Sequence, residues 1–176
     1  DGMGSGSLAC KESEMVIELV EKFLEAGFDV ETAVRMMNSA MVMKGQEDLF
    51  STVDISELDL YDGTCHFYKI GAAATFIRRN GIVECLISTS LPVGVSYKLD
   101  MEKSEKDLYN GDFLVMVSDG ILDAFPGNHG EDKVQELILN ETTDNAAEMA
   151  KNILEEVLKF RRRKAEDDMT VLVGGL

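Results

Sequence analysis

The chain has 176 residues, a formal net charge of −16 at pH 7 and a hydrophobic fraction of 45%. This length allows one domain with a buried core. The acidic balance argues against nucleic acid or an anionic membrane as a partner, because both favour basic patches. No stretch has the character of a signal peptide or of a membrane-spanning helix. Three cysteines without any C-x-x-C spacing indicate reduced core residues and a cytoplasmic location, not a disulfide framework or a zinc site. They are Cys10, Cys65 and Cys85.

Two amphipathic helices are predicted near the N-terminus. Apolar residues from Met15 to Leu24 recur at helical spacing and predict a helix from about Ala9 to Ala26, ended by Gly27. Asp29 is expected to cap a second helix, whose apolar residues run from Val30 to Met41. Methionines more often fill a core, but this helix is apolar on more than one side, so a dimer or partner-binding face stays open. Those methionines are Met36, Met37, Met41 and Met43.

From Ser51 onward the pattern changes to short strands with tight turns. A strand over 53–60, a turn at Asp62-Gly63 and a return over 65–70 are predicted. The strands 75–79 and 82–87 flank Asn80-Gly81, a strong hairpin signal. A third pairing is expected around Asn110-Gly111, followed by a buried strand over 113–117. Two helices, over about 134–138 and 146–158, precede a last strand over 169–173.

Hairpins and separate blocks of helices predict an α+β fold with antiparallel sheets, because a doubly wound parallel sheet would alternate strands and helices. The last strand must insert beside an earlier one. If it lies antiparallel to the strand over 113–117, Asp119 and Asp167 fall on the same edge of the sheet.

Three acidic motifs stand at chain breaks, and their carboxylates suit a hard divalent cation. Mg²⁺ and Mn²⁺ prefer oxygen ligands at ~2.1 Å and keep several waters, so few protein ligands suffice. The alternative is that these Asp-Gly pairs are ordinary turns. The motifs are Asp1-Gly2-Met3-Gly4-Ser5-Gly6, Ser118-Asp119-Gly120 and Asp167-Asp168-Met169-Thr170.

With Leu91-Pro92-Val93-Gly94 and Gly111-Asp112-x-Leu114 between them, these motifs resemble the metal-dependent serine/threonine phosphatases of the type 2C (PPM) class. The most similar branch is the phosphatase domain of the stage II sporulation protein E family. The resemblance covers nearly the whole chain as one domain, 1–176. It implies a sandwich of two antiparallel sheets flanked by helices.

The resemblance also implies the site residues. Asp1 would bridge two metal ions, Mn²⁺ or Mg²⁺, and the Gly2 carbonyl would bind one of them, while Asp119 and Asp167 would hold the other. Asp168 stands where relatives often have Asn and is expected to orient the site from a second shell. For Asp123 the resemblance leaves two readings, a contact to an additional metal or a helix N-cap.

The implied reaction is attack by a metal-activated water on phosphoserine or phosphothreonine of a regulatory protein, an anti-sigma-factor antagonist in bacterial sporulation. Some relatives carry a candidate proton donor, a His, where this chain has Met3, so a side-chain acid is not expected. His66 and His129 are isolated and are expected to be structural or exposed.

Two other function classes stay open. An inactive phosphatase-like binding or regulatory module is disfavoured by the intact Asp1, Asp119 and Asp167. A phospho-acceptor receiver domain is disfavoured by the hairpins, because that class needs alternating β/α units.

The chain begins at Asp1, without the strands that precede this motif in the family, so we expect it to be a piece truncated at its N-terminus. A membrane anchor in the absent upstream region stays open.

Residues 161–164 form a basic run that is read as an exposed helix end or, alternatively, as a docking patch near Asp167. The helix pair over 9–44 is a candidate switch that would set metal affinity when the upstream region or a second copy docks on it. The alternative is that both helices merely cover a sheet.

Overall fold

The computed structural model describes residues 2, 7–44, 50–127, 129–160 and 168–176, with backbone only at 7–10. Within these ranges no helix is long and apolar enough to cross a membrane. The contacts divide the chain into two compact units, each with its own core. The first unit comprises Asp1–Glu57, His66–Ala72 and Ser88–Glu105, and the second comprises Leu58–Cys65, Ala73–Ile87 and Lys106–Leu176.

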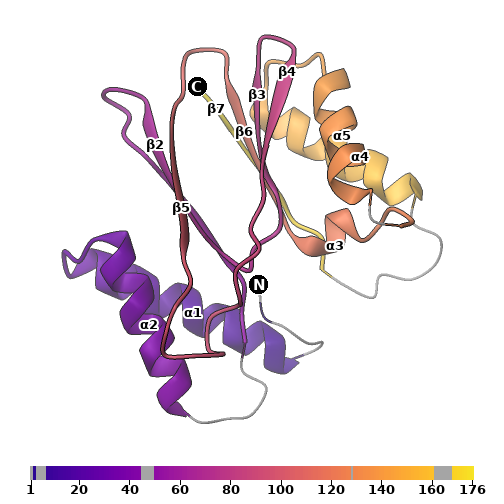
Figure 1. Cartoon of the computed structure of the whole chain (residues 1–176). Helices are drawn as coiled ribbons and strands as arrows, with labels where there is room; N and C mark the ends of the chain where they lie inside the picture. The colour runs from indigo at the N-terminus through magenta and orange to yellow at the C-terminus, as the bar shows by residue number, and fades with distance from the viewer. Residues whose placement is uncertain (1, 3–6, 45–49, 128, 161–167) are drawn as a thin grey trace. The chain divides into compact units, whose positions relative to one another are not determined.

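Helices α1 (Ser7–Glu25) and α2 (Val30–Lys44) pack against each other in the first unit (Figure 1). Gly27 ends α1 with φ +87°, as predicted. Asp29 caps α2, because its carboxylate accepts the backbone N–H of Thr32 at 2.9 Å and the Thr32 hydroxyl at 2.8 Å. These bonds hold the pKa of Asp29 below its usual range. The predicted stop signal of α1 and the predicted cap of α2 are therefore confirmed, with α1 beginning two residues earlier than expected.

Most of a three-stranded sheet, in the order β1-β2-β5, completes the first unit. Its strands are β1 (Val53–Leu58), β2 (Thr64–Ile70) and β5 (Glu102–Asp107). His66 of β2 pairs with Glu105 of β5, and Lys103 of β5 lies 5.9 Å from the ring centre of Tyr68 of β2. A later residue of β2 therefore contacts an earlier residue of β5. The two strands are therefore antiparallel. Apolar side chains of this sheet share one core with α1 and α2, among them Val53, Ile70 and Met37.

The loop over residues 93–96 is bound to α2 by the buried side-chain amide of Asn38. The Asn38 Oδ1 accepts the N–H of Gly94 at 2.8 Å, and its Nδ2 donates to the carbonyl of Ser96 at 2.9 Å. The neighbouring Val93 exchanges two backbone hydrogen bonds with Ser51. Ser51 in turn pairs with Gly2 in an isolated antiparallel bridge. The Asp-Gly motif thus joins the first unit through Gly2.

The second unit contains a four-stranded sheet in the order β4-β3-β6-β7, all pairs antiparallel. The strands are β3 (Thr75–Arg79), β4 (Ile82–Leu86), β6 (Phe113–Val117) and β7 (Val171–Gly175). Asn80 and Gly81 have φ of 49° and 74° and form the predicted hairpin turn between β3 and β4. The apolar strand β6 lies between β3 and β7, which explains why Val115 is fully buried.

The described residues of this unit form three helices, of which α4 and α5 pack on the sheet (Figure 1). They are α3 (Asp119–Leu122), α4 (Gly130–Asn140) and α5 (Ala146–Phe160). Ile121 of α3, Ile138 of α4 and Ile153 of α5 are fully buried in the core around β6. The backbone of Gly130 lies so close to α3 that a Cβ there would meet the carbonyl oxygen of Leu122 at 2.5 Å. This close approach holds the short helix α3 against the start of α4.

The predicted third pairing around Asn110-Gly111 is wrong. The strand before this turn, β5, lies beside β2 in the other sheet, whereas β6 after the turn pairs with β3 and β7. Arg79 at the end of β3 holds the intervening segment, because it donates to Asp112 and to the carbonyl of Asp107. A turn motif alone does not reveal such a change of sheet.

The last strand, β7, begins two residues later than predicted and continues through Gly174 and Gly175. These glycines pair with Leu114 and Phe113, because β7 follows the whole length of β6. Gly175 lies under the ring of Phe113, where a Cβ would be 3.1 Å from a ring carbon. Other boundaries differ by one to four residues: β1 ends at Leu58, where the turn begins, and α4 begins at Gly130, four residues before the predicted start.

Candidate metal centre

Asp119 is the first residue of α3 and directly follows the end of β6. Its side chain is exposed, and its Oδ1 accepts the backbone N–H of the next residue, Gly120, at 2.8 Å. A fixed strand end thus carries an accessible carboxylate with one oxygen oriented by the backbone. This placement suits a ligand to a hard cation.

The chain returns to this edge at Asp168, as the antiparallel-neighbour argument predicts. Val117 of β6 pairs with Val171 of β7, so the residues after β6 face the residues before β7. The Ser118 hydroxyl donates to the carbonyl of Asp168 at 3.0 Å and accepts the N–H of Thr170 at 2.9 Å. The exposed Asp168 and Asp119 therefore flank one edge of the sheet. The basic run over 161–164 and Asp167 itself belong to a stretch, 161–167, that is not described.

Asp123 is not a helix N-cap. It is the C-cap of α3, where its backbone N–H bonds to the carbonyl of Asp119 at 2.9 Å, and His129 is the N-cap of α4. Its carboxylate is exposed and lies four residues after Asp119, the spacing of neighbours on a helix face. The alternative that the resemblance offered, a contact to an additional metal, stays a prediction.

The other predicted ligands belong to the first unit. Gly2 is buried and pairs with Ser51, while Asp1 is outside the described ranges. Ser51 is fully buried, and its Oγ has no hydrogen-bond partner among the described residues. A polar atom left in this state is costly unless another group binds to it.

Among the residues with described side chains, no group of three His, Cys, Asp or Glu residues is arranged to hold a metal ion. Two of the four predicted ligands, Asp1 and Asp167, lie outside the described residues. The donor set as a whole consists of carboxylate oxygens and a backbone carbonyl, which are the ligands that Mg²⁺ and Mn²⁺ prefer. The donor atoms of these residues are therefore of the type that binds the implied metal, and the Asp119 carboxylate is accessible.

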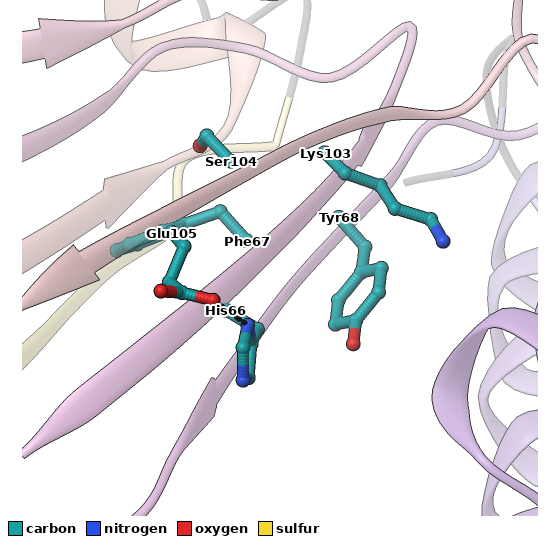
Figure 2. A pocket seen from close by; sticks show the side chains of 6 residues that line it. All are labelled: His66, Phe67, Tyr68, Lys103, Ser104 and Glu105. Carbon is teal, nitrogen blue, oxygen red and sulfur yellow. Dashed lines mark ion pairs between the residues drawn. The ribbon is translucent and has the colours of Figure 1, made fainter.

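A pocket of about 290 Å³ lies over β2 and β5 in the first unit (Figure 2). His66 and Glu105 point toward each other there, with 3.4 Å between Nδ1 and Oε2, and Tyr68 and Lys103 lie on the same strands. No predicted metal ligand lines this pocket. His129 is exposed and lies 3.6 Å from Asp132. Both histidines are thus exposed at least in part, and neither lies among the predicted ligands.

The two cysteines of the described region lie in or against a core. Cys65 is fully buried, and Cys85 packs against the core of the second unit.

On α1 and α2 an apolar groove of about 420 Å³ is open to solvent. Met36 and Met43 of α2 line it with Phe23 of α1, while Met37 and Met41 fill the core. The methionines of α2 therefore serve both a core and an exposed face.

Comparison with known proteins gives one consistent family. The family model described as stage II sporulation protein E (SpoIIE) matches residues 1–175. Stage II sporulation protein E of Bacillus subtilis is 36% identical over 174 residues, which cover 98% of this chain and 21% of that protein. The chain thus spans about a fifth of the length of this relative.

Two solved structures of the Bacillus subtilis protein match as well. The structure of its PP2C phosphatase domain with a fragment of the regulatory domain has a TM-score of 0.89 and 36% identity, over 98% of this chain and 52% of that one. A structure of the phosphatase domain presoaked with Mn has a TM-score of 0.66 and 33% identity, over 91% and 71% of the two chains. These matches confirm the predicted resemblance and the α+β PP2C phosphatase fold with antiparallel sheets.

Proposed function

The chain belongs to the stage II sporulation protein E family, and on this premise we propose that it is a metal-dependent phosphatase domain, 1–176, for phosphoserine and phosphothreonine. The observation that supports this best is the edge of the second unit, where Ser118 joins Asp119 and Asp168 after strands β6 and β7. We further propose that the substrate is a phosphorylated regulatory protein, an anti-sigma-factor antagonist in sporulation. An inactive binding module is the weaker alternative, because the acidic motifs are intact.

The residues that would hold Mn²⁺ or Mg²⁺, with two ions expected, are Asp1, Gly2 through its carbonyl, Asp119 and Asp167. When bound, the cations supply Lewis acidity that lowers the pKa of water and offsets the charge of the phosphoryl oxygens. Asp119 contributes a carboxylate oriented by the N–H of Gly120. Asp168 is proposed to orient this edge, where its backbone carbonyl accepts the hydrogen bond from the Ser118 hydroxyl.

The chain offers few side chains for proton transfer to the leaving group. Met3 has no titratable proton, and Asp119 must stay ionised to hold a cation. His66 belongs to a pair on the outer part of β2, and His129 caps α4. The reaction is therefore expected to depend on pH through water and not through a side-chain acid.

The test is phosphate release from a phosphoserine protein by the full-length protein, with Mn²⁺, with Mg²⁺ and with EDTA. We expect release only with a divalent ion, and rates within about threefold of the parent for His66→Ala and His129→Ala, because general acid catalysis would supply roughly a hundredfold or more. A hundredfold loss in either variant contradicts the water-based proposal. Metal-independent release contradicts the metal centre.

The exposed groove on α1 and α2 is the proposed docking surface for a second copy or for the upstream region. Met43 is 75% exposed and Met36 37% exposed, and both line the same groove, the kind of apolar patch that marks an interaction surface. Because Gly2 lies in the same unit, docking on these helices is proposed to set metal affinity.

The double substitution Met36→Ser with Met43→Ser is expected to raise the Mn²⁺ concentration for half-maximal activity by about fivefold or more, a coupling of ~1 kcal/mol. Ile17→Ser is the control, because Ile17 is exposed on α1 but does not line the groove. Light scattering distinguishes a second copy from the upstream region. If stability, metal affinity and turnover all match the parent, the helices only cover the sheet.

A further inference from the structure

Ser118 stands at the point where the β6–β7 ladder ends. The last printed pair of the ladder is Val117 with Val171. One residue further, the backbone N–H of Ser118 still donates to the carbonyl of Thr170 at 3.1 Å. Beyond this bond the two chains separate, because Asp119 begins α3.

The Ser118 side chain continues the ladder in place of the backbone. Its Oγ accepts the N–H of Thr170 at 2.9 Å and donates to the carbonyl of Asp168 at 3.0 Å. One hydroxyl thus bonds to a donor and an acceptor two residues apart on the opposing chain. Both lengths are those of well-formed hydrogen bonds, and together they fix the backbone over 168–170.

The residues next to this clamp are proposed metal ligands. Asp119 directly follows Ser118, and Asp167 directly precedes Asp168. If both carboxylates hold one cation, as proposed, their like charges would repel each other in its absence. A metal site needs its supporting groups to hold the ligands within about 0.5 Å of the productive geometry. The hydroxyl of Ser118 restrains the chain on both sides of the edge at once.

We propose that Ser118 is a positioning residue that prepares the edge of β6 and β7 for divalent metal binding, an inference that rests on the proposed function. It contacts neither metal nor substrate in this role. Loss of a supporting group outside the ligand shell typically costs 10–100-fold in metal affinity. Its loss should therefore weaken metal binding while turnover at saturating metal is largely kept.

Thr143 provides a matched control in the same unit. Its hydroxyl also accepts a backbone N–H, that of Asn145 at 3.2 Å, and donates to Glu148 at 2.7 Å. It lies toward the other end of β6, because Arg78, which pairs with Phe113, donates to the carbonyl of Glu141. Thr143→Val therefore removes two comparable hydrogen bonds without touching the proposed site.

The experiment compares Ser118→Ala, Ser118→Thr and Thr143→Val in the full-length protein. Mn²⁺ affinity is measured without substrate, from the rise of the melting temperature with metal concentration, and turnover is measured separately. We expect Ser118→Ala to raise the Mn²⁺ dissociation constant at least about tenfold. Ser118→Thr keeps the hydroxyl and should stay within about twofold. Thr143→Val should match the parent in metal affinity.

The outcomes separate this inference from the proposed function. If the parent binds Mn²⁺ and Ser118→Ala binds it equally well, Ser118 does not position the site, and the phosphatase proposal stands. An equal weakening by Thr143→Val would trace the loss to general stability and would overturn the inference. If the parent neither binds Mn²⁺ nor releases phosphate, the proposed function fails first. Should Ser118→Ala not fold, Ser118→Cys, with its weak donor, replaces it under the same tenfold expectation.

Discussion

Arg79→Met is expected to lower the free energy of unfolding by about 3 kcal/mol or more, because it leaves a buried carboxylate without its cation. The side chain of Asp112 is only 4% exposed. Arg79 Nε lies 3.0 and 2.9 Å from its two oxygens, and the N–H of Tyr109 donates to one of them at 2.8 Å. The guanidinium also lies 4.7 Å from the ring centre of Tyr109. Chemical denaturation of the parent and the variant measures the difference.

The two partners of this pair are not equivalent. Arg79 is 38% exposed, so Asp112→Asn leaves a cation that water can reach, and we expect a smaller loss than for Arg79→Met. The hydrogen bonds to Asp112 raise the pKa of Arg79 in the folded state. The stability that this raised pKa contributes is fully present at any pH below the pKa of Arg79 in the unfolded chain. It is lost only as the pH rises through the pKa of Arg79 in the folded state. The difference between the two variants should therefore persist at neutral pH.

Lys133→Met is the control for the loss of a cation at the surface. Lys133 lies 2.8 Å from Glu136, and both side chains are more than half exposed. Such pairs contribute about 0–1 kcal/mol. If Arg79→Met destabilises the protein no more than Lys133→Met, the pair with Asp112 is not a support of the second unit.

The local signals of the sequence predicted the elements well where one or two residues decide the backbone. Asn80 and Gly81 adopt positive φ in the predicted hairpin turn, Gly27 ends α1, and Asp29 caps α2. Each of these effects acts within a few residues, so the chain pattern alone determines them.

The partners of β5 and β6 could not be predicted in the same way. Asn110-Gly111 is a good turn motif, but whether the flanking strands pair depends on Arg79, 33 residues before Asp112. The short helix α3 was also missed, because Ser118-Asp119-Gly120 is equally typical of a turn. Long-range side-chain bonds of this kind leave no periodic trace in the sequence.

For the candidate site, the sequence proposed the acidic ligands, but it gave no indication of the bonds that hold the chain beside them. The return of the chain beside β6 was expected from the last strand, and the register of Val117 with Val171 confirms that the strands are antiparallel neighbours. The clamp by Ser118 was missed, because its two partners lie about 50 residues away. Only the strand register would have indicated that Ser118 faces Thr170.

Asp119→Asn is expected to reduce Mn²⁺-dependent phosphate release on the order of a thousandfold or more, and Asp167→Asn is expected to do the same. Asp119 is exposed, and an amide oxygen can still accept the N–H of Gly120, so the fold should be kept. The amide lacks the negative charge that holds a cation, so the metal-induced rise in melting temperature should also be lost.

Asp132→Asn is the control, because this carboxylate is 81% exposed on α4 and is not a proposed ligand. Asp168→Asn should keep most of the activity, since this residue acts through its backbone carbonyl. Phosphate release over a Mn²⁺ titration, with circular dichroism as a check on folding, measures all four variants. Near-normal turnover of Asp119→Asn at saturating Mn²⁺ would remove Asp119 from the metal centre and, with it, the main structural support for the proposed phosphatase.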